Sequence, residues 1–173
     1  MSSTAGTWHT RGLDAFQQGT FGNAGQNIYV SHAGVLQRIH LYDCNKDGYL
    51  DLLFCNAQAH LESPPAYVYS DILANPQCTE LPAEGAGTAA VADLNGNGYD
   101  DLVIGNEKSG EPGPLNAFVY YGATPGLSER YRLLLPAHRC TSTTIADFNG
   151  DGRPDLAFIT DGKIRLFYQS ELA

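Results

Sequence analysis

The chain has 173 residues, of which 43% are hydrophobic and 17% are charged. This composition excludes an intrinsically disordered chain and is sufficient for one domain with a buried core. The formal net charge is −9, and Lys and Arg form no cluster, which argues against a nucleic-acid-binding surface. No stretch has the length and hydrophobicity of a membrane span.

Residues 1–26 carry the weakest pattern in the chain. Trp8 and Phe16 are their apolar landmarks, and residues 19–25 have the composition of a loop. We interpret this segment as an N-terminal linker or a partial strand, followed by one repeated unit over residues 27–173. Residues 1–11 are small and polar, so they contain no secretory signal sequence.

From residue 27 onward, three similar blocks consist of short apolar runs separated by turn residues, which is typical of buried β-strands. In each block we expect an inner strand, a polar loop, a second strand and a third strand. A further run before each block is interpreted as the outer strand of the preceding unit. The expected ranges are 27–30, 78–81 and 131–135 for the outer strands; 36–42, 88–92 and 141–146 for the inner strands; 51–55, 101–105 and 155–159 for the second strands; and 66–69, 117–121 and 164–168 for the third strands.

The polar loop after each inner strand is the most regular feature of the sequence. The three copies read Asp43-Cys-Asn-Lys-Asp-Gly-Tyr-Leu-Asp51, Asp93-Leu-Asn-Gly-Asn-Gly-Tyr-Asp-Asp101 and Asp147-Phe-Asn-Gly-Asp-Gly-Arg-Pro-Asp155. Positions 1, 3, 5 and 9 carry oxygen-bearing side chains, and position 6 is glycine, which tolerates the positive φ of a sharp bend. A single copy is compatible with an ordinary polar turn, but three copies with one spacing indicate a common ligand.

Carboxylate, amide and carbonyl oxygens around one point suit a hard cation, above all Ca²⁺. We therefore predict about three bound Ca²⁺ ions, with the backbone carbonyl of position 7 as a further ligand in each loop. The predicted ligands are Asp43, Asn45, Asp47, Tyr49 and Asp51; Asp93, Asn95, Asn97, Tyr99 and Asp101; and Asp147, Asn149, Asp151, Arg153 and Asp155.

An EF-hand is excluded as the source of these loops. An EF-hand requires a bidentate Glu at position 12 and flanking helices. Position 12 is occupied by Phe54, Ile104 and Phe158, and each loop runs into a short apolar strand pattern. The loop is therefore expected to join two strands, with its last ligand at the start of the second.

The segments Ala92-Asp-Leu-Asn-Gly-Asn-Gly-Tyr-Asp-Asp-Leu-Val-Ile-Gly105 and Ala146-Asp-Phe-Asn-Gly-Asp-Gly-Arg-Pro-Asp-Leu156 resemble FG-GAP/VCBS-type repeats. These are the calcium-loop repeats of integrin α-subunit heads and of many bacterial and fungal propeller proteins. The resemblance implies an all-β fold, a β-propeller with four-stranded blades and calcium between the first two strands of each blade.

The strand tally then gives about three blades, of which the last lacks an outer strand. Propellers typically have four to eight blades. We expect the ring to be completed by head-to-tail homo-oligomerisation, with the fragment of a larger propeller as the alternative. In the last block, Asp161-Gly162 predicts a tight hairpin between the second and third strands.

The expected function is ligand recognition by an extracellular or cell-surface module, with a glycan (lectin-like) or a protein in adhesion as the ligand. The alternatives are part of a polysaccharide-degrading, lyase-type enzyme, or a purely structural repeat of a larger surface protein. No catalytic residue is predicted, because the five histidines are scattered and no catalytic motif is present. The extracellular expectation follows from the weak calcium affinity typical of such modules; the export signal is expected upstream of this chain.

The four cysteines, Cys44, Cys55, Cys78 and Cys140, fit no zinc-binding spacing. An even number permits two disulfides in an oxidising compartment, and free buried thiols are the equally open alternative. None of the four recurs at the same position of the repeat, so they are not part of the repeated pattern.

Overall fold

The structure is a computed structural model that describes residues 27–30, 36–42, 51–58, 65–70, 77–107, 113–124 and 126–172. Within these ranges the fold is all-β, with no α-helix and two short 3₁₀ turns, η2 (Glu129–Tyr131) and η3 (Gln169–Glu171). No helix in the described part of the chain has the length and hydrophobicity that crossing a bilayer requires. The segment 1–26 and its predicted linker role lie outside the described residues.

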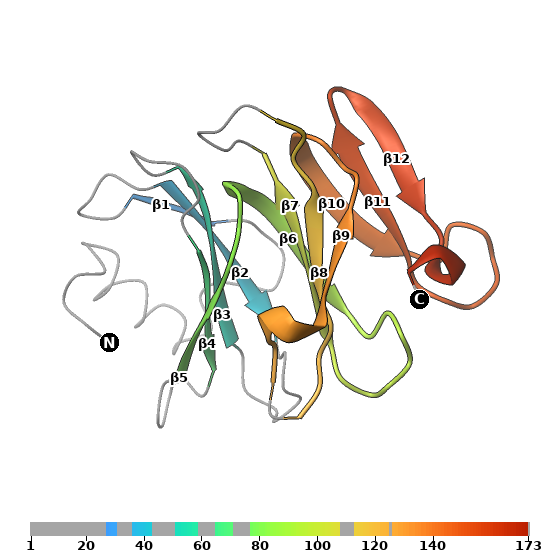
Figure 1. The fold of residues 1–173 in the computed structure, drawn as a ribbon, viewed down its shortest axis with the longest axis horizontal. Coiled ribbons are helices and arrows are strands. Elements are labelled where there is room, and N and C mark those ends of the chain that lie inside the picture. Colours follow the sequence, from blue (N-terminus) through green and yellow to red (C-terminus); the bar gives the residue numbers. More distant parts are fainter. Residues whose placement is uncertain are drawn as a thin grey trace.

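The strands form three antiparallel sheets, which Figure 1 shows side by side in chain order. The first sheet contains β1 (Asn27–Val30), β2 (Leu36–Tyr42), β3 (Asp51–Gln58), β4 (Ala66–Ser70) and β5 (Gln77–Leu81), in that order. The second contains β6 (Ala86–Ala92), β7 (Asp101–Asn106), β8 (Ala117–Tyr120) and β9 (Arg132–Leu135). The third contains β10 (Cys140–Ala146), β11 (Asp155–Thr160) and β12 (Lys163–Phe167).

Every strand that the sequence predicts is present, with ends that differ by a few residues at most. The registers repeat from sheet to sheet, because Leu52 pairs with Tyr69, Leu102 with Tyr120 and Leu156 with Phe167. The predicted hairpin is also confirmed: Asp161 and Gly162 have φ of 48° and 73° and connect β11 to β12. Both values are positive, as a two-residue Asp-Gly turn requires.

The interpretation of residues 27–30 as the outer strand of a preceding blade is wrong in this structure. β1 pairs antiparallel with β2, from Asn27 opposite Ile39 to Val30 opposite Leu36. The first sheet therefore has five strands where four were expected, and the third has three. The short connection between β1 and β2 allows antiparallel pairing, and pairing satisfies hydrogen-bonding groups at the free edge of β2.

Two apolar clusters hold the sheets together. The second sheet contributes to both, because successive residues of a strand point to opposite faces. Leu102, Ile104 and Tyr120 pack in a cluster with residues of the first sheet. Val103 and Val119 pack in a cluster with residues of the third sheet. Burial on both faces explains why β7 and β8 are apolar at nearly every position.

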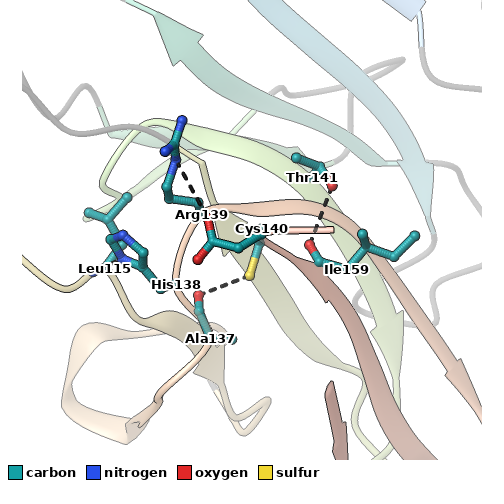
Figure 2. A network of polar contacts seen from close by, with 8 residues as sticks. Leu115, Ala137, His138, Arg139, Cys140, Thr141 and Ile159 are labelled. Carbon is teal, nitrogen blue, oxygen red and sulfur yellow. Dashed lines mark hydrogen bonds and ion pairs between the residues drawn. The ribbon is translucent and has the colours of Figure 1, made fainter. Parts of the chain in front are cut away.

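The turn between the second and third sheets is held by several polar contacts, drawn in Figure 2. The backbone N–H of Leu115 donates to His138 Nδ1 at 2.8 Å, and the Cys140 thiol donates to the Ala137 carbonyl at 3.0 Å. Arg139 has a φ of 53°, which is unusual for a residue with a side chain. The imidazole of His138 thus acts as an acceptor for a loop, which is a structural role.

Cys55, Cys78 and Cys140 form no disulfide bond. Among these three residues the free-thiol alternative is therefore the one that the structure adopts. Cys55 and Cys140 are buried, whereas Cys78 is exposed on β5. Cys44 lies outside the described residues.

Candidate metal centre

Two of the three predicted calcium loops lie within the described residues, and both join the first two strands of a sheet. The middle loop (residues 93–101) connects β6 to β7, and the last loop (147–155) connects β10 to β11. This confirms the predicted strand–loop–strand arrangement. Of the first loop, only Asp51 is described; it is buried, at the first residue of β3, while Asp43, Asn45, Asp47 and Tyr49 lie outside the described residues.

In the middle loop the side-chain oxygens at positions 1, 3 and 5 accept hydrogen bonds from the backbone of the same loop. Asp93 Oδ1 accepts from Asn97 N at 3.0 Å, and Asp93 Oδ2 accepts from Gly98 N at 2.8 Å. Asn95 Oδ1 also accepts from Asn97 N, and Asn97 Oδ1 accepts from Tyr99 N. These bonds form consecutive Asx turns, which hold the oxygens inside the bend.

The last loop repeats these four bonds and adds one from Gly150 N to Asp147 Oδ1 at 2.7 Å. Asp147 Oδ1 accepts from Asp151 N at 3.1 Å, and Asp147 Oδ2 accepts from Gly152 N at 2.8 Å. Asn149 Oδ1 accepts from Asp151 N, and Asp151 Oδ1 accepts from Arg153 N, both at 2.9 Å. The nine-residue pattern therefore specifies a single local conformation in two different sheets.

The glycines at positions 4 and 6 permit this conformation. Gly96 and Gly98 have φ of 73° and 88°, and Gly150 and Gly152 have φ of 79° and 82°. A β-carbon built on any of the four would meet no atom within 4 Å. The glycines are needed for the positive φ and not for space.

The position-9 aspartates differ from the others because they are buried. Asp101 and Asp155 each have 0% of their surface exposed. Asp101 Oδ2 accepts from Leu94 N at 2.8 Å, and the equivalent bond joins Asp155 Oδ2 to Phe148 N at 3.0 Å. The carboxylate at the start of the second strand therefore closes the loop onto its own beginning.

The second oxygen of each buried aspartate binds the residue that follows the third strand of the sheet by two positions. Asp101 Oδ1 accepts from Gly122 N at 2.7 Å, and Asp155 Oδ1 accepts from Gln169 N at 2.9 Å. Sequence reasoning missed both residues. Only their backbone N–H groups are used and their side chains have nothing in common, so no sequence signal marks them.

The environment shifts the pKa of two of these carboxyl groups in opposite directions. Backbone N–H donors, first that of Gly152, hold the pKa of the Asp147 carboxyl below its usual value. Burial raises the pKa of the Asp101 carboxyl, although hydrogen bonds from Gly122 and Leu94 oppose the shift. Desolvation penalises the charged form, whereas hydrogen bonds to the carboxylate favour it.

The donor set of both loops is chemically suited to Ca²⁺, since every predicted ligand atom is an oxygen. Within the described ranges no three Asp, Glu, His or Cys side chains are gathered tightly enough to form a metal cluster. In the middle loop this follows partly from composition, because Asn95, Asn97 and the Tyr99 carbonyl are three of the five predicted ligands. The residues present fit the ion by ligand type.

Residues 93–158 match the family model of the FG-GAP-like repeat. The matched segment begins at the first aspartate of the middle loop and ends within β11, so it covers both described loops. The predicted resemblance is thereby confirmed over this segment, which is consistent with an FG-GAP-type repeat. No curated protein matches the chain.

Proposed function

We propose that the chain is a calcium-binding β-propeller module in which each loop holds one Ca²⁺ ion. The observation that carries this proposal is the shared hydrogen-bond scheme of the middle and last loops. It orients the side-chain oxygens of equivalent positions in the same way in both loops. The ligands would be the side chains at positions 1, 3, 5 and 9 with the carbonyl of position 7. When bound, the ion supplies positive charge that offsets the repulsion among the carboxylates.

Calcium removal tests this proposal directly. We expect the melting temperature to fall when Ca²⁺ is replaced by EDTA, because a ligand that binds only the folded state adds about 2.7 kcal/mol per site at a hundredfold excess over its Kd. Scanning calorimetry gives the measurement. Glu80→Gln, which removes one exposed charge outside the loops, is the matched control and should keep the full calcium response. An unchanged melt in EDTA would contradict the proposal.

The number of carboxylates sets the expected order of the sites. The last loop carries three, at Asp147, Asp151 and Asp155, whereas the middle loop carries two at its ligand positions. Asp147→Ala should therefore cost more calcium affinity than Asn97→Ala, since a charged ligand is lost in one case and a neutral ligand in the other. Calorimetric titration with Ca²⁺ measures the affinity of both variants. A larger loss of calcium affinity in Asn97→Ala than in Asp147→Ala would contradict the expected order.

The propeller part of the proposal is supported by the serial packing of the sheets. Each strand pair of the second sheet turns one set of residues toward the first sheet and the alternate set toward the third. Sheets stacked in this way, each with an FG-GAP-type loop after its inner strand, would be successive blades.

For the module we propose an extracellular or cell-surface location and a role in ligand recognition, with carbohydrate as the ligand class. Loops of this type fill at the calcium concentrations found outside cells. The rings of Tyr99, Tyr131 and Tyr168 are substantially exposed, and aromatic rings offer flat apolar faces to sugars. The fold alone specifies no ligand, so the ligand class depends on the residues of a particular site.

We also propose that the module associates with further blades, in the first instance those of a second copy arranged head to tail. On β12, Ile164 is 74% exposed and Leu166 is 40% exposed. Leu166 pairs with Ala157 as Val119 pairs with Val103 in the second sheet. Val103 and Val119 are fully buried against the third sheet, so the equivalent face of the third sheet is suited to the same kind of contact.

A further inference from the structure

A cavity of about 220 Å³ lies between the first two sheets, beside the middle loop. β4 and β5 contribute hydroxyl groups from Ser70 and Thr79, and two loops of the second sheet, before β7 and after β8, contribute those of Tyr99 and Thr124. Val68 and Leu127 add apolar surface. The cavity is smaller than the roughly 300–1,000 Å³ of sites for drug-sized ligands, so its ligand must be small.

The lining of this cavity indicates the charge and chemistry of the ligand. Two carboxylates line it, Asp100 and Asp51, of which Asp51 is also the position-9 residue of the first loop, and no Lys, Arg or His does so among the described residues. The Asp100 carboxylate, which is not a predicted metal ligand, would repel an anionic ligand there. Hydroxyl and carboxylate groups next to apolar surface match a molecule that has several hydroxyls and an apolar ring face, which is the chemistry of a neutral sugar ring.

One wall of the cavity is attached to the middle calcium loop. Gly122 N donates to Asp101 Oδ1 at 2.7 Å, and Asn97 Nδ2 donates to the Gly122 carbonyl at 2.9 Å. Both polar groups of the Gly122 backbone are thus bound by predicted metal ligands. A β-carbon at Gly122 would overlap the backbone carbonyl oxygen of Asp100, so this close approach requires glycine.

A second contact joins the loop to the same wall further along. The hydroxyls of Tyr99 and Thr124 are 2.7 Å apart and form a hydrogen bond. Tyr99 occupies position 7 of the middle loop, and Thr124 follows Gly122 along the wall. The position of the wall therefore depends on the conformation of the loop at three residues, Asn97, Tyr99 and Asp101.

We infer that this cavity binds a neutral monosaccharide unit and that binding depends on calcium in the middle loop, transmitted through Gly122. The inference rests on the proposed calcium function and assigns its ligand site. Calcium bound by Asn97 and Asp101 holds the two side chains that clamp Gly122, which keeps the wall in place. Without the ion these side chains are held by hydrogen bonds alone, so the wall of the cavity is less firmly fixed.

Binding is tested by calorimetric titration of the calcium-loaded chain with methyl glycosides of glucose, galactose, mannose and N-acetylglucosamine. We expect at least one neutral glycoside to bind and methyl glucuronide, which is anionic, not to bind. Thr124→Val, at an exposed site, should weaken binding about fivefold to tenfold, as the loss of one or two hydrogen bonds implies. Ser170→Ala, at an exposed position outside the cavity, is the control and should leave affinity unchanged.

Asn97→Asp separates the coupling from calcium binding itself. The substitution keeps an oxygen ligand and adds a charge, as at the equivalent Asp151 of the last loop, but it removes the N–H donor to the Gly122 carbonyl. We expect calcium affinity to be retained or increased and glycoside affinity to fall. Equal glycoside affinity in this variant, or in EDTA, would overturn the coupling.

The same titrations distinguish failure of the proposed calcium function from failure of the cavity as the glycoside site. If calcium itself gives no binding heat and no change in melting temperature, the proposed calcium function fails. If calcium binds but no neutral glycoside does, or if Thr124→Val binds the glycoside as well as the original chain, the assignment of the cavity fails and the calcium function stands.

Discussion

At the scale of single residues, two equivalent positions of the repeat show how a β-carbon changes the conformational energy of a turn. Arg139, in the turn before β10, and Gly85, in the turn before β6, occupy the same place in their turns. Their φ values are 53° and 65°. Both copies of the turn require a positive φ at this position. Arg139 has a β-carbon, so this conformation is higher in energy for Arg139 than for Gly85.

Arg139→Gly should therefore stabilise the protein by about 1 kcal/mol, since it removes a left-handed conformation that costs an L-residue about 1–2 kcal/mol. The greater entropy of glycine in the unfolded chain reduces the gain. The ion pair lost with the side chain, to Asp161 at 3.9 Å, is long and exposed and contributes little. Urea unfolding gives the measurement, and a destabilised variant would contradict the argument. Gly85→Arg is the reciprocal variant and should destabilise.

The cysteines give a second prediction at this scale, which concerns pH. Burial raises the pKa of the Cys140 thiol to about 12 from the ordinary value of 9.0. In the native protein Cys140 should therefore resist alkylation up to about pH 9, because the thiolate is the reactive form, whereas the exposed Cys78 should react. Mass spectrometry after iodoacetamide treatment identifies the labelled residue; rapid native labelling of Cys140 would refute the burial argument.

The same shift has a consequence for stability. The pKa of the Cys140 thiol is higher in the folded than in the unfolded chain, so the unfolded chain loses this proton first as pH rises. The free energy of unfolding is therefore unaffected below about pH 9 and decreases as pH rises from about 9 toward about 12. Cys140→Ala should flatten this alkaline decline in the free energy of unfolding, although it also leaves a small gap in the core.

At the scale of elements, local sequence decides that a strand or loop forms, and packing decides how near its neighbours come. Gly105 in β7 illustrates the second effect. A β-carbon there would lie 2.5 Å from Thr88 Cγ2 and 2.8 Å from Cys140 Cβ. The glycine lets β7, β6 and β10 approach one another at this level, where the second and third sheets meet.

Gly105→Ala should accordingly destabilise the protein by about 1–3 kcal/mol, the usual cost of overpacking a filled core. Thermal or urea unfolding measures the effect. Ser170→Ala, at an exposed position near the C-terminal turn, adds no atoms to the core and is the control. A variant as stable as the original chain would mean that the sheets separate without cost.

At the scale of the whole molecule, three sheets stacked in series leave one apolar face of the third sheet exposed. Ile159 pairs with Ile164 across β11 and β12, and both are exposed, together with Leu166. Adjacent exposed apolar residues of this kind mark interaction surfaces. We therefore expect the calcium-loaded chain to self-associate through this face.

Light scattering on a sizing column in calcium tests this expectation. The mass should be at least twice the 18.6 kDa of the single chain. Ile164→Lys should shift the mass toward 18.6 kDa without lowering the melting temperature of the monomer, because the side chain is 74% exposed there. A monomeric original chain at high concentration would contradict self-association.

The strands, the loops and the conformation of the two described loops could be predicted from local sequence. Apolar runs between turn residues specify strands, and the alternating oxygens with glycine at position 6, joined by glycine at position 4 in the middle and last loops, specify the Asx turns. The match of residues 93–158 to the FG-GAP-like repeat was also predictable, since it depends on the same spacing. The Asp161-Gly162 hairpin belongs to this group, because positive φ at both residues favours that dipeptide.

Three features depend on packing between distant parts of the chain: the strand that lies beside β2, the backbone groups that bind the buried aspartates, and the position of the cavity. β1 carries a strand signal but no signal for its partner, because backbone hydrogen bonds pair any two free edges. Gly122 and Gln169 bind Asp101 and Asp155 through their N–H groups, which every residue but proline possesses. The cavity depends on the packing of two sheets, and contacts between residues far apart in the chain leave no periodic trace in a single sequence.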